Sequence, residues 1–263
     1  MLAPTKVIRT NARIALKKNR TAYTVAATAL IFTVLFISLG TELFSSTAGD
    51  IAAVLFLISV SVFLFFPLVL GVLRFFWRSL FDARDGFSEV FYYFSSGSAY
   101  KRAAGVSLRL AVRVIGIAVA CFIPSGIVKA LCSPELYSFF NISIPNFATN
   151  LWFVQDCLYS IGLIAFLLLQ LRYYLVPFLT VSNGELSTAD IFMVSRMISR
   201  RNAYDFIGLI FSFAGWIILS LAAIPLLYTV PYFVMAYIVH CRFAVAQYNA
   251  VANRQYDGYA FNI

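Results

Sequence analysis

Long apolar runs are the feature that most constrains what this chain can fold into. They are nearly free of charged residues, and their lengths approach or exceed the roughly 18 residues that cross about 30 Å of bilayer hydrocarbon. The runs cover Ala22–Leu39, Ile51–Leu73, Val106–Leu131, Leu151–Leu171, Phe206–Ile224 and Pro231–Gln247. Because they are continuous rather than alternating, a transmembrane β-barrel is excluded. We therefore predict an all-α integral membrane protein with six transmembrane helices.

The composition agrees with this class. The chain is 62% hydrophobic and 12% charged, whereas charged residues make up about a quarter of a soluble domain. The basic N-terminal region is long, and the first apolar run is followed by Thr41-Glu42 without a small-x-small cleavage pattern, so we do not expect a cleavable signal peptide. We expect one polytopic membrane domain over residues 1–263: a basic segment (1–20), a six-span bundle (22–248) and a tail (249–263).

The distribution of basic residues predicts the orientation. Of the 20 Lys and Arg residues, only Lys129 falls toward a loop that this arrangement places outside, and the remaining 19 fall on the inner side. The positive-inside rule then places both termini in the cytoplasm. We expect a multi-pass protein of the plasma membrane. Topology and anionic lipid account for the net charge of +9, so we expect no nucleic-acid partner.

The N-terminal segment Thr5–Arg20 has the pattern of an amphipathic helix. Its cations and its apolar residues recur every three or four positions, which places them on separate faces of a helix. The cations are Lys6, Arg9, Arg13, Lys17 and Arg20, and the apolar residues are Ile8, Ala12, Ala15 and Leu16. Two interpretations stay open: a helix lying in the interface and attracted to anionic lipid, or a positive flank that only sets topology.

Two further short helices are predicted on the inner side. Phe87–Phe94 carries one apolar stripe, and Ser187–Ser199 begins with Ser187 as an N-cap and Asp190 three residues later. At an offset of 98 residues, Arg74-Phe75-Phe76 coincides with Arg172-Tyr173-Tyr174, and Gly86 coincides with Gly184. This indicates a direct repeat of two helix hairpins, each with a cytoplasmic amphipathic helix, flanked by the first and last spans. The alternative is that unrelated hairpins share interfacial aromatics and glycines.

The stretch Leu171–Trp216 and parts of the N-terminal half resemble a bacterial membrane family, domain of unknown function family 975, found mostly in Firmicutes. The matching residues are Arg172-Tyr173, Pro177-Phe178, Asp190, Ser195-Arg196, Asn202, Phe206, Ser212-Phe213-Ala214-Gly215-Trp216, Asn11–Asn19 and Gly71–Phe75. Arg201, where the family tends to have Gly, and His240-Cys241, in place of an expected aromatic pair, depart from the pattern. The resemblance implies an integral membrane fold and no known activity.

We find no catalytic constellation in the sequence. His240 is the single histidine, and no glycine-rich phosphate loop or G-x-S-x-G motif is present. We therefore expect no enzyme activity, no metal site and no cofactor. Cys132 and Cys157 both fall near the predicted outer surface; a disulfide between them and two free thiols are both compatible with the sequence.

A few charged residues are candidates for a role. Lys129 and Asp156 fall at the outer ends of consecutive spans and form a candidate ion pair; two independent interfacial charges are the alternative. His240 and Arg242 are costly groups in the last span and could line a cavity. The candidate surface for lipid or a protein partner consists of Lys6, Arg9, Arg13, Lys17, Arg196, Arg200 and Arg201.

Two function classes follow from these features. The first is a non-enzymatic accessory or scaffold protein that binds anionic lipid headgroups or a protein partner at the inner leaflet. The second is a transporter of small molecules or ions with a polar cavity between the repeats. Asp156 is the only acid well inside a predicted span, and transport sites usually contain several such groups, which favours the first class.

Overall fold

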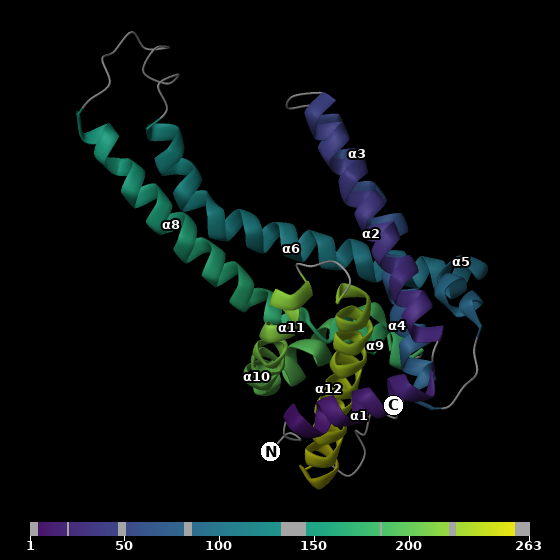
Figure 1. Ribbon diagram of the computed structural model, residues 1–263. Helices are drawn as coiled ribbons and strands as arrows, with labels where there is room; N and C mark the ends of the chain where they lie inside the picture. Colours follow the sequence, from purple (N-terminus) through teal and green to yellow (C-terminus); the bar gives the residue numbers. More distant parts are fainter. Residues whose placement is uncertain are drawn as a thin grey trace. The chain divides into compact units, whose positions relative to one another are not determined.

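The computed structural model describes residues 5–19, 21–46, 51–81, 86–132, 146–184, 186–220 and 225–255. All regular elements in these ranges are helical (Figure 1), which confirms the all-α part of the predicted fold class. The chain divides into two compact units. The first contains residues 1–108 and 173–263, and the second contains residues 109–172.

The first unit opens with a helix, α1 (Thr5–Lys18), and a long apolar hairpin. One arm is α2 (Thr21–Ser46); the other is α3 (Ile51–Val60), the π-helical turn η1 (Ser61–Phe65) and α4 (Phe66–Ser79). The ring of Phe36 stacks on that of Phe65 with centroids 4.9 Å apart, so the two arms pack side by side. The first two predicted spans are therefore helices, and the second extends past the predicted end at Leu73.

The segment after Gly86 differs from the predicted single helix. It forms a 3-10 helix, η2 (Phe87–Phe91), followed by one turn of α-helix, α5 (Tyr92–Ser95). Val90 is buried, whereas Phe87, Phe91 and Phe94 are exposed. In a 3-10 helix side chains recur every three residues, so the predicted i, i+4 stripe does not stay on one face.

The second unit is a pair of helices. It contains most of α6 (Gly97–Leu131) and α8 (Asn146–Gln170). A Cβ at Gly162 would lie 2.6 Å from the carbonyl oxygen of Cys121, so the absence of a side chain lets the two backbones approach closely. Helix α6 continues through Pro124 to Leu131 and does not end at this proline.

The C-terminal part of the first unit begins at Tyr173, the last residue of η3 (Leu171–Tyr173). It contains α9 (Val176–Ser182), α10 (Thr188–Ser212), α11 (Ala214–Leu219) and α12 (Leu226–Gln255). The Ser187 side chain accepts a hydrogen bond from the backbone N–H of Asp190, which confirms the predicted N-cap. The predicted inner helix does not stop at Ser199. No Gly or Pro interrupts the chain there, and the helix runs on to Ser212.

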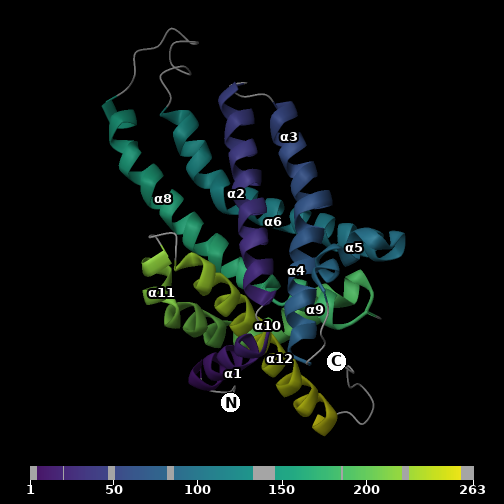
Figure 2. The ribbon, with the colours of Figure 1, turned by 45° about the vertical axis from the view of Figure 1, so that its right-hand side comes forward.

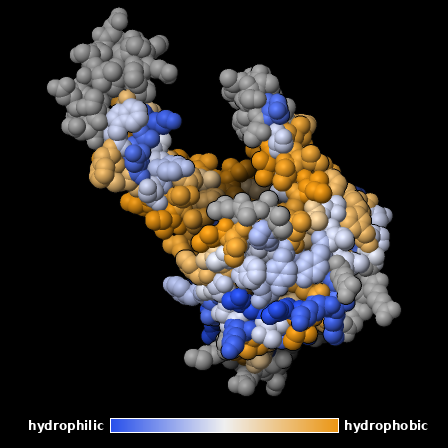
Figure 3. Space-filling model, in the orientation of Figure 1, coloured by the Kyte–Doolittle hydropathy of each residue, from blue (hydrophilic) through white to orange (hydrophobic). Residues whose placement is uncertain are grey.

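The core of the first unit lies where α1, α4, α9, α10 and α12 meet. Its largest buried side chains include Phe75, Phe178, Phe192 and Phe213. By contrast, α2 and α3 present exposed apolar side chains such as Ile31 and Val34, which are about 60% exposed. Figure 3 shows this hydrophobic surface over α2 and α3 and a hydrophilic band along α1. The surface of the apolar hairpin is therefore suited to lipid.

Five described helices are long and apolar enough to cross a membrane: Thr21–Gly40, Leu55–Ser79, Gly97–Leu131, Trp152–Ser182 and Leu226–Val251. This supports a membrane protein. The predicted span Phe206–Ile224 is not among them. Its described part contains a break at Phe213, where α10 ends, and the six-residue helix α11; residues 221–224 lie outside the described ranges.

The last helix is placed differently from its prediction. Tyr228 stacks with Tyr23 at the start of α2, with centroids 6.2 Å apart, and Tyr232 contacts Arg9 of α1. In Figures 1 and 2, α1 lies across α12. The sequence placed the linker Pro225–Val230 outside and α1 inside. These contacts instead put the beginning of α12 beside α1 and the start of α2.

Candidate functional site: the basic groove of helix α1

Helix α1 is attached to the protein by its apolar stripe. Ile8, Ala12 and Leu16 are each at most 2% exposed, and α1 makes its most extensive contact with α12. These three residues share the face that the sequence predicted to be apolar. In the structure this stripe packs against other helices of the protein.

The opposite side of α1 forms an open groove, which we call the basic groove. It has a volume of about 450 Å³ and is lined by four cations of α1, Lys6, Arg9, Arg13 and Lys17, with Ser212 and Tyr232 on its other side. None of the described residues that line it is acidic. Four of the five cations predicted on this helix therefore share one groove; the fifth, Arg20, lies outside the described residues.

Arg9 is the cation that joins the groove to the core. Its Nε donates a hydrogen bond to the hydroxyl of Tyr232 at 3.4 Å, and that hydroxyl donates to the backbone carbonyl of Arg9 at 3.4 Å. The Arg9 guanidinium also lies 5.4 Å from the ring centroid of Phe213. Lys6, Arg13 and Lys17 are exposed, so these three are displayed to solvent while Arg9 helps to fix the helix.

The spacing of the cations suits an array of anions. Residues three or four apart on a helix are neighbours about 5–6 Å apart at Cβ, so the groove offers a positive charge at nearly every turn. A Lys or Arg close to an anionic membrane surface contributes about 1 kcal/mol to association. Helix α1, which lines the groove, directly precedes α2 in the chain, and the first candidate span begins at Thr21. We therefore expect the groove near the level of the lipid headgroups.

The three candidate arginines of α10 lie outside this groove. Arg196, Arg200 and Arg201 are exposed. Arg201 lines a separate cavity of about 410 Å³ together with Asp205, Gln247 and other residues of α10 and α12. The structure therefore does not bring these arginines into the lining of the basic groove, and their role as a lipid or partner surface stays a prediction.

His240 and Arg242 do not line a common cavity among the described pockets. His240 is fully buried; its Nε2 lies 3.3 Å from the Tyr174 hydroxyl, and its ring lies 5.6 Å from that of Phe206. Arg242 is exposed and stands 5.1 Å from the ring centroid of Phe81. The two neighbours in sequence point into different surroundings, as adjacent residues of a helix do.

The outer candidates lie in the second unit. Lys129, in the last turn of α6, and Asp156, in α8, are both exposed, and no ion pair joins them among the described residues. The coupling of these two charges stays a prediction. Cys132 is buried and Cys157 is exposed, and both are free thiols.

Sequence reasoning missed the polar partners of these sites. Tyr232 falls within the predicted last span and Ser212 within the predicted span Phe206–Ile224, and neither carries a signal that it lies beside α1. Comparison of the chain with family models, with curated proteins and with solved structures found no match. The resemblance to family 975 therefore stays a prediction.

Proposed function

We propose that this protein is a non-enzymatic accessory or scaffold protein of the plasma membrane that binds anionic lipid headgroups at the inner leaflet. The observation that supports this most is the basic groove, in which Lys6, Arg9, Arg13 and Lys17 line one open surface without a described acid. Because α1 is fixed by its buried stripe, the cations are held in place, so less conformational entropy is lost on binding.

The proposal includes a topology with both termini in the cytoplasm. Four crossings would be made by α2, by α3 with α4, by α6, and by α8 with α9. The hairpin of α10, α11 and α12 would stay at the inner side, as the contacts of Tyr228 with Tyr23 and of Tyr232 with Arg9 suggest. This arrangement keeps 19 of the 20 cations on the inner side, as the six-span arrangement does.

The exposed arginines of α10 are a second part of the proposed surface. Arg196, Arg200 and Arg201 would bind an acidic segment of a protein partner or add to lipid attraction. A transporter is the alternative function. The buried His240, whose Nδ1 has no hydrogen-bond partner, is the observation in its favour, but His240 lies among aromatic rings rather than along a described polar cavity.

The test is to replace Lys6, Arg13 and Lys17 with Gln and leave Arg9 in place. The purified full chain is titrated with mixed micelles containing phosphatidylglycerol, and the affinity is compared with that of the unaltered protein. Loss of three cations should cost about 3 kcal/mol, or roughly a hundredfold in affinity. High salt should reduce the difference, since exposed charges are screened.

A charge-matched variant provides the comparison. Replacing Arg196, Arg200 and Arg201 with Gln removes the same charge from exposed positions outside the groove. If the α1 variant keeps its full affinity for phosphatidylglycerol, the lipid proposal fails. If the α10 variant keeps both its affinity and its set of co-purifying proteins, these arginines have no part in the surface.

A further inference from the structure

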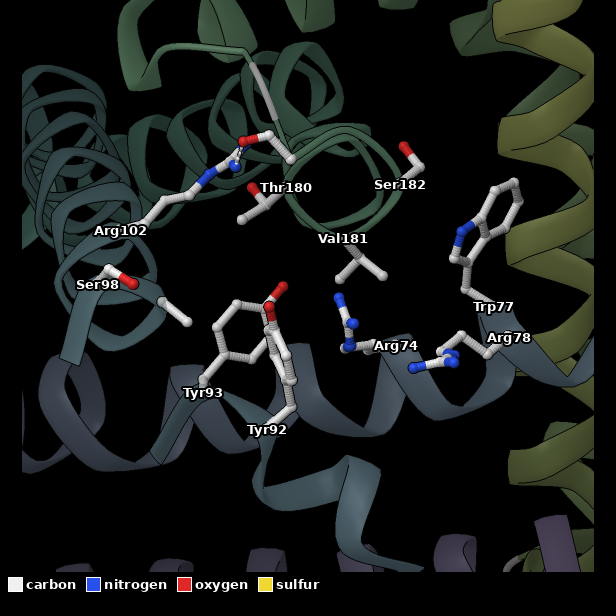
Figure 4. A pocket seen from close by; sticks show the side chains of 12 residues that line it. Arg74, Trp77, Arg78, Tyr92, Tyr93, Ser98, Arg102, Thr180, Val181 and Ser182 are labelled. Atoms are coloured by element: carbon white, nitrogen blue, oxygen red, sulfur yellow. Dashed lines mark hydrogen bonds between the residues drawn. The ribbon is translucent and has the colours of Figure 1, made fainter. Parts of the chain in front are cut away.

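A second polar cavity lies in the first unit, between the end of α4, the beginning of α6, α5 and the end of α9. We call it the arginine cavity. Its volume is about 570 Å³, and its lining includes Arg74, Arg78 and Arg102 together with Tyr92 and Tyr93. Figure 4 shows these side chains around the cavity, with Thr180, Val181 and Ser182 of α9 on the opposite side.

Arg102 gives the wall of the arginine cavity a positive charge that no described carboxylate compensates. The other two arginines have a carboxylate partner: Glu89, just outside the lining, receives hydrogen bonds from Arg74 Nε at 2.9 Å and from Arg78 Nη1 at 2.8 Å. Arg102 bonds to the backbone carbonyls of Asn183, Gly184 and Leu186, which are uncharged. None of the described lining residues is acidic. A partly buried cation without full charge compensation favours an anion beside it.

Several hydrogen-bond donors point into this space. The Nε of Arg74 donates a hydrogen bond to Glu89. In Figure 4 the Arg74 guanidinium is directed into the cavity, near the hydroxyl groups of Tyr92 and Tyr93. Burial raises the pKa of Tyr93 to about 12, although the charges of Arg74 and Arg102 oppose this. The Tyr93 hydroxyl therefore keeps its proton at neutral pH and can donate it to an anion.

Two polar atoms of the lining lack a protein partner. Arg102 Nε and Ser182 Oγ are buried and make no hydrogen bond. Buried polar groups in folded proteins nearly always have a partner, and an exception calls for a bound group or water. Because the two Nη atoms of Arg102 donate to the carbonyls of Asn183, Gly184 and Leu186, the orientation of this guanidinium is set before any ligand binds.

We propose that the arginine cavity binds the phosphate group of a phosphomonoester or phosphodiester. Guanidinium groups bind phosphate oxygens in paired, charge-assisted hydrogen bonds, and hydroxyl donors complete the shell of the remaining oxygens. The site is separate from the basic groove and shares no residue with it, so the proposal does not depend on lipid binding by α1. This phosphate group could belong to a phospholipid headgroup or to a soluble phosphate compound.

An apolar groove next to the cavity offers a place for an acyl chain. It has a volume of about 330 Å³ and is lined by Phe32 and Phe36 of α2, Phe65 of η1, and Phe91 and Phe94, among other apolar residues. The segment of η2 and α5 borders both sites, because Tyr92 and Tyr93 of the arginine cavity lie between Phe91 and Phe94 in sequence. A lipid could therefore place its phosphate in the arginine cavity and an acyl chain in the apolar groove.

The test uses Trp77, which lines the arginine cavity, as a fluorescent reporter in the full chain with Trp152→Phe and Trp216→Phe. The detergent-purified protein is titrated with inorganic phosphate, dioctanoyl phosphatidic acid and dioctanoylglycerol, and the melting temperature is recorded as an independent measure of binding. Phosphatidic acid should give a saturable change and a higher melting temperature, and dioctanoylglycerol, which has no phosphate, should give neither.

Variants connect the signal to the cavity. Ser182→Ala, alone and with Tyr93→Phe, should weaken phosphatidic acid binding, at least tenfold in the double variant. Tyr100→Phe is the matched control, because the Tyr100 hydroxyl donates to the Phe63 carbonyl outside the cavity. The variant with Lys6→Gln, Arg13→Gln and Lys17→Gln should keep the fluorescence response of Trp77. This result would show that the arginine cavity binds independently of the basic groove.

The outcomes distinguish the two sources of phosphate. If inorganic phosphate also saturates the signal, the phosphate group alone is recognised. If only phosphatidic acid does, the ligand is a lipid, and Phe94→Ala should weaken it further. The proposal is overturned if neither probe gives a saturable change in fluorescence or melting temperature, or if both cavity variants bind as tightly as the Tyr100→Phe control.

Discussion

Gly71 lets the backbones of α4 and η2 approach each other closely. It lies in α4 directly beneath η2, and a Cβ built on it would stand 1.8 Å from the backbone carbonyl oxygen of Val90. The sequence could not reveal this, because a glycine inside an apolar run is common in membrane helices. By contrast, Ser187 with Asp190 was predictable, since an N-cap acts within one helical turn.

Gly71→Ala should therefore destabilise the protein. Backbone atoms of η2 would have to move, and overpacking of this kind costs about 1–3 kcal/mol, more than the helix propensity of Ala returns. Gly208→Ala is the control, because nothing lies within 4 Å of a Cβ there. Thermal unfolding in detergent should show a lower melting temperature for Gly71→Ala alone; equal melting temperatures would mean that η2 does not pack on α4 as described.

At the scale of the element, α1 shows what periodicity can and cannot predict. The spacing of its residues fixed which side chains share a face, and the buried Ile8, Ala12 and Leu16 confirm that face. Periodicity does not identify the partner of an apolar stripe, and lipid and protein are equally apolar. The predicted repeat stays a prediction, since its two inner segments differ: η2 with α5 is short, whereas α10 continues to Ser212.

Leu16→Ala should loosen α1 from α12. Truncating a buried Leu costs about 2–5 kcal/mol, which is enough to release a single short helix. Ile14→Ala is the matched control on the same helix, because Ile14 is 52% exposed. Limited proteolysis of the N-terminal segment in detergent should be faster for Leu16→Ala than for Ile14→Ala. Equal rates for the two variants would show that the stripe does not hold α1.

At the scale of the whole molecule, the apolar runs predicted a helical membrane protein with six spans, and the described residues contain five candidate spans. Hydropathy records how apolar a helix is and not what surrounds it. The apolar window of α12 is 61% buried inside the protein, against at most 28% for the other four candidate spans. Aromatic residues of α12 pack inside the protein; the ring of Tyr232, for example, contacts that of Phe213. No pattern within the run itself distinguishes that use from contact with lipid.

The proposed topology places α1 and the beginning of α12 together on the cytoplasmic side. Impermeant maleimide labelling of intact cells tests this most directly, with Thr10→Cys, Leu227→Cys and Ser46→Cys placed singly in a chain without its four native cysteines. Thr10 and Leu227 are both exposed. We predict labelling from outside at position 46 alone, and labelling at positions 10 and 227 only after the membrane is permeabilised. Labelling of position 227 from outside in intact cells would contradict the proposed topology.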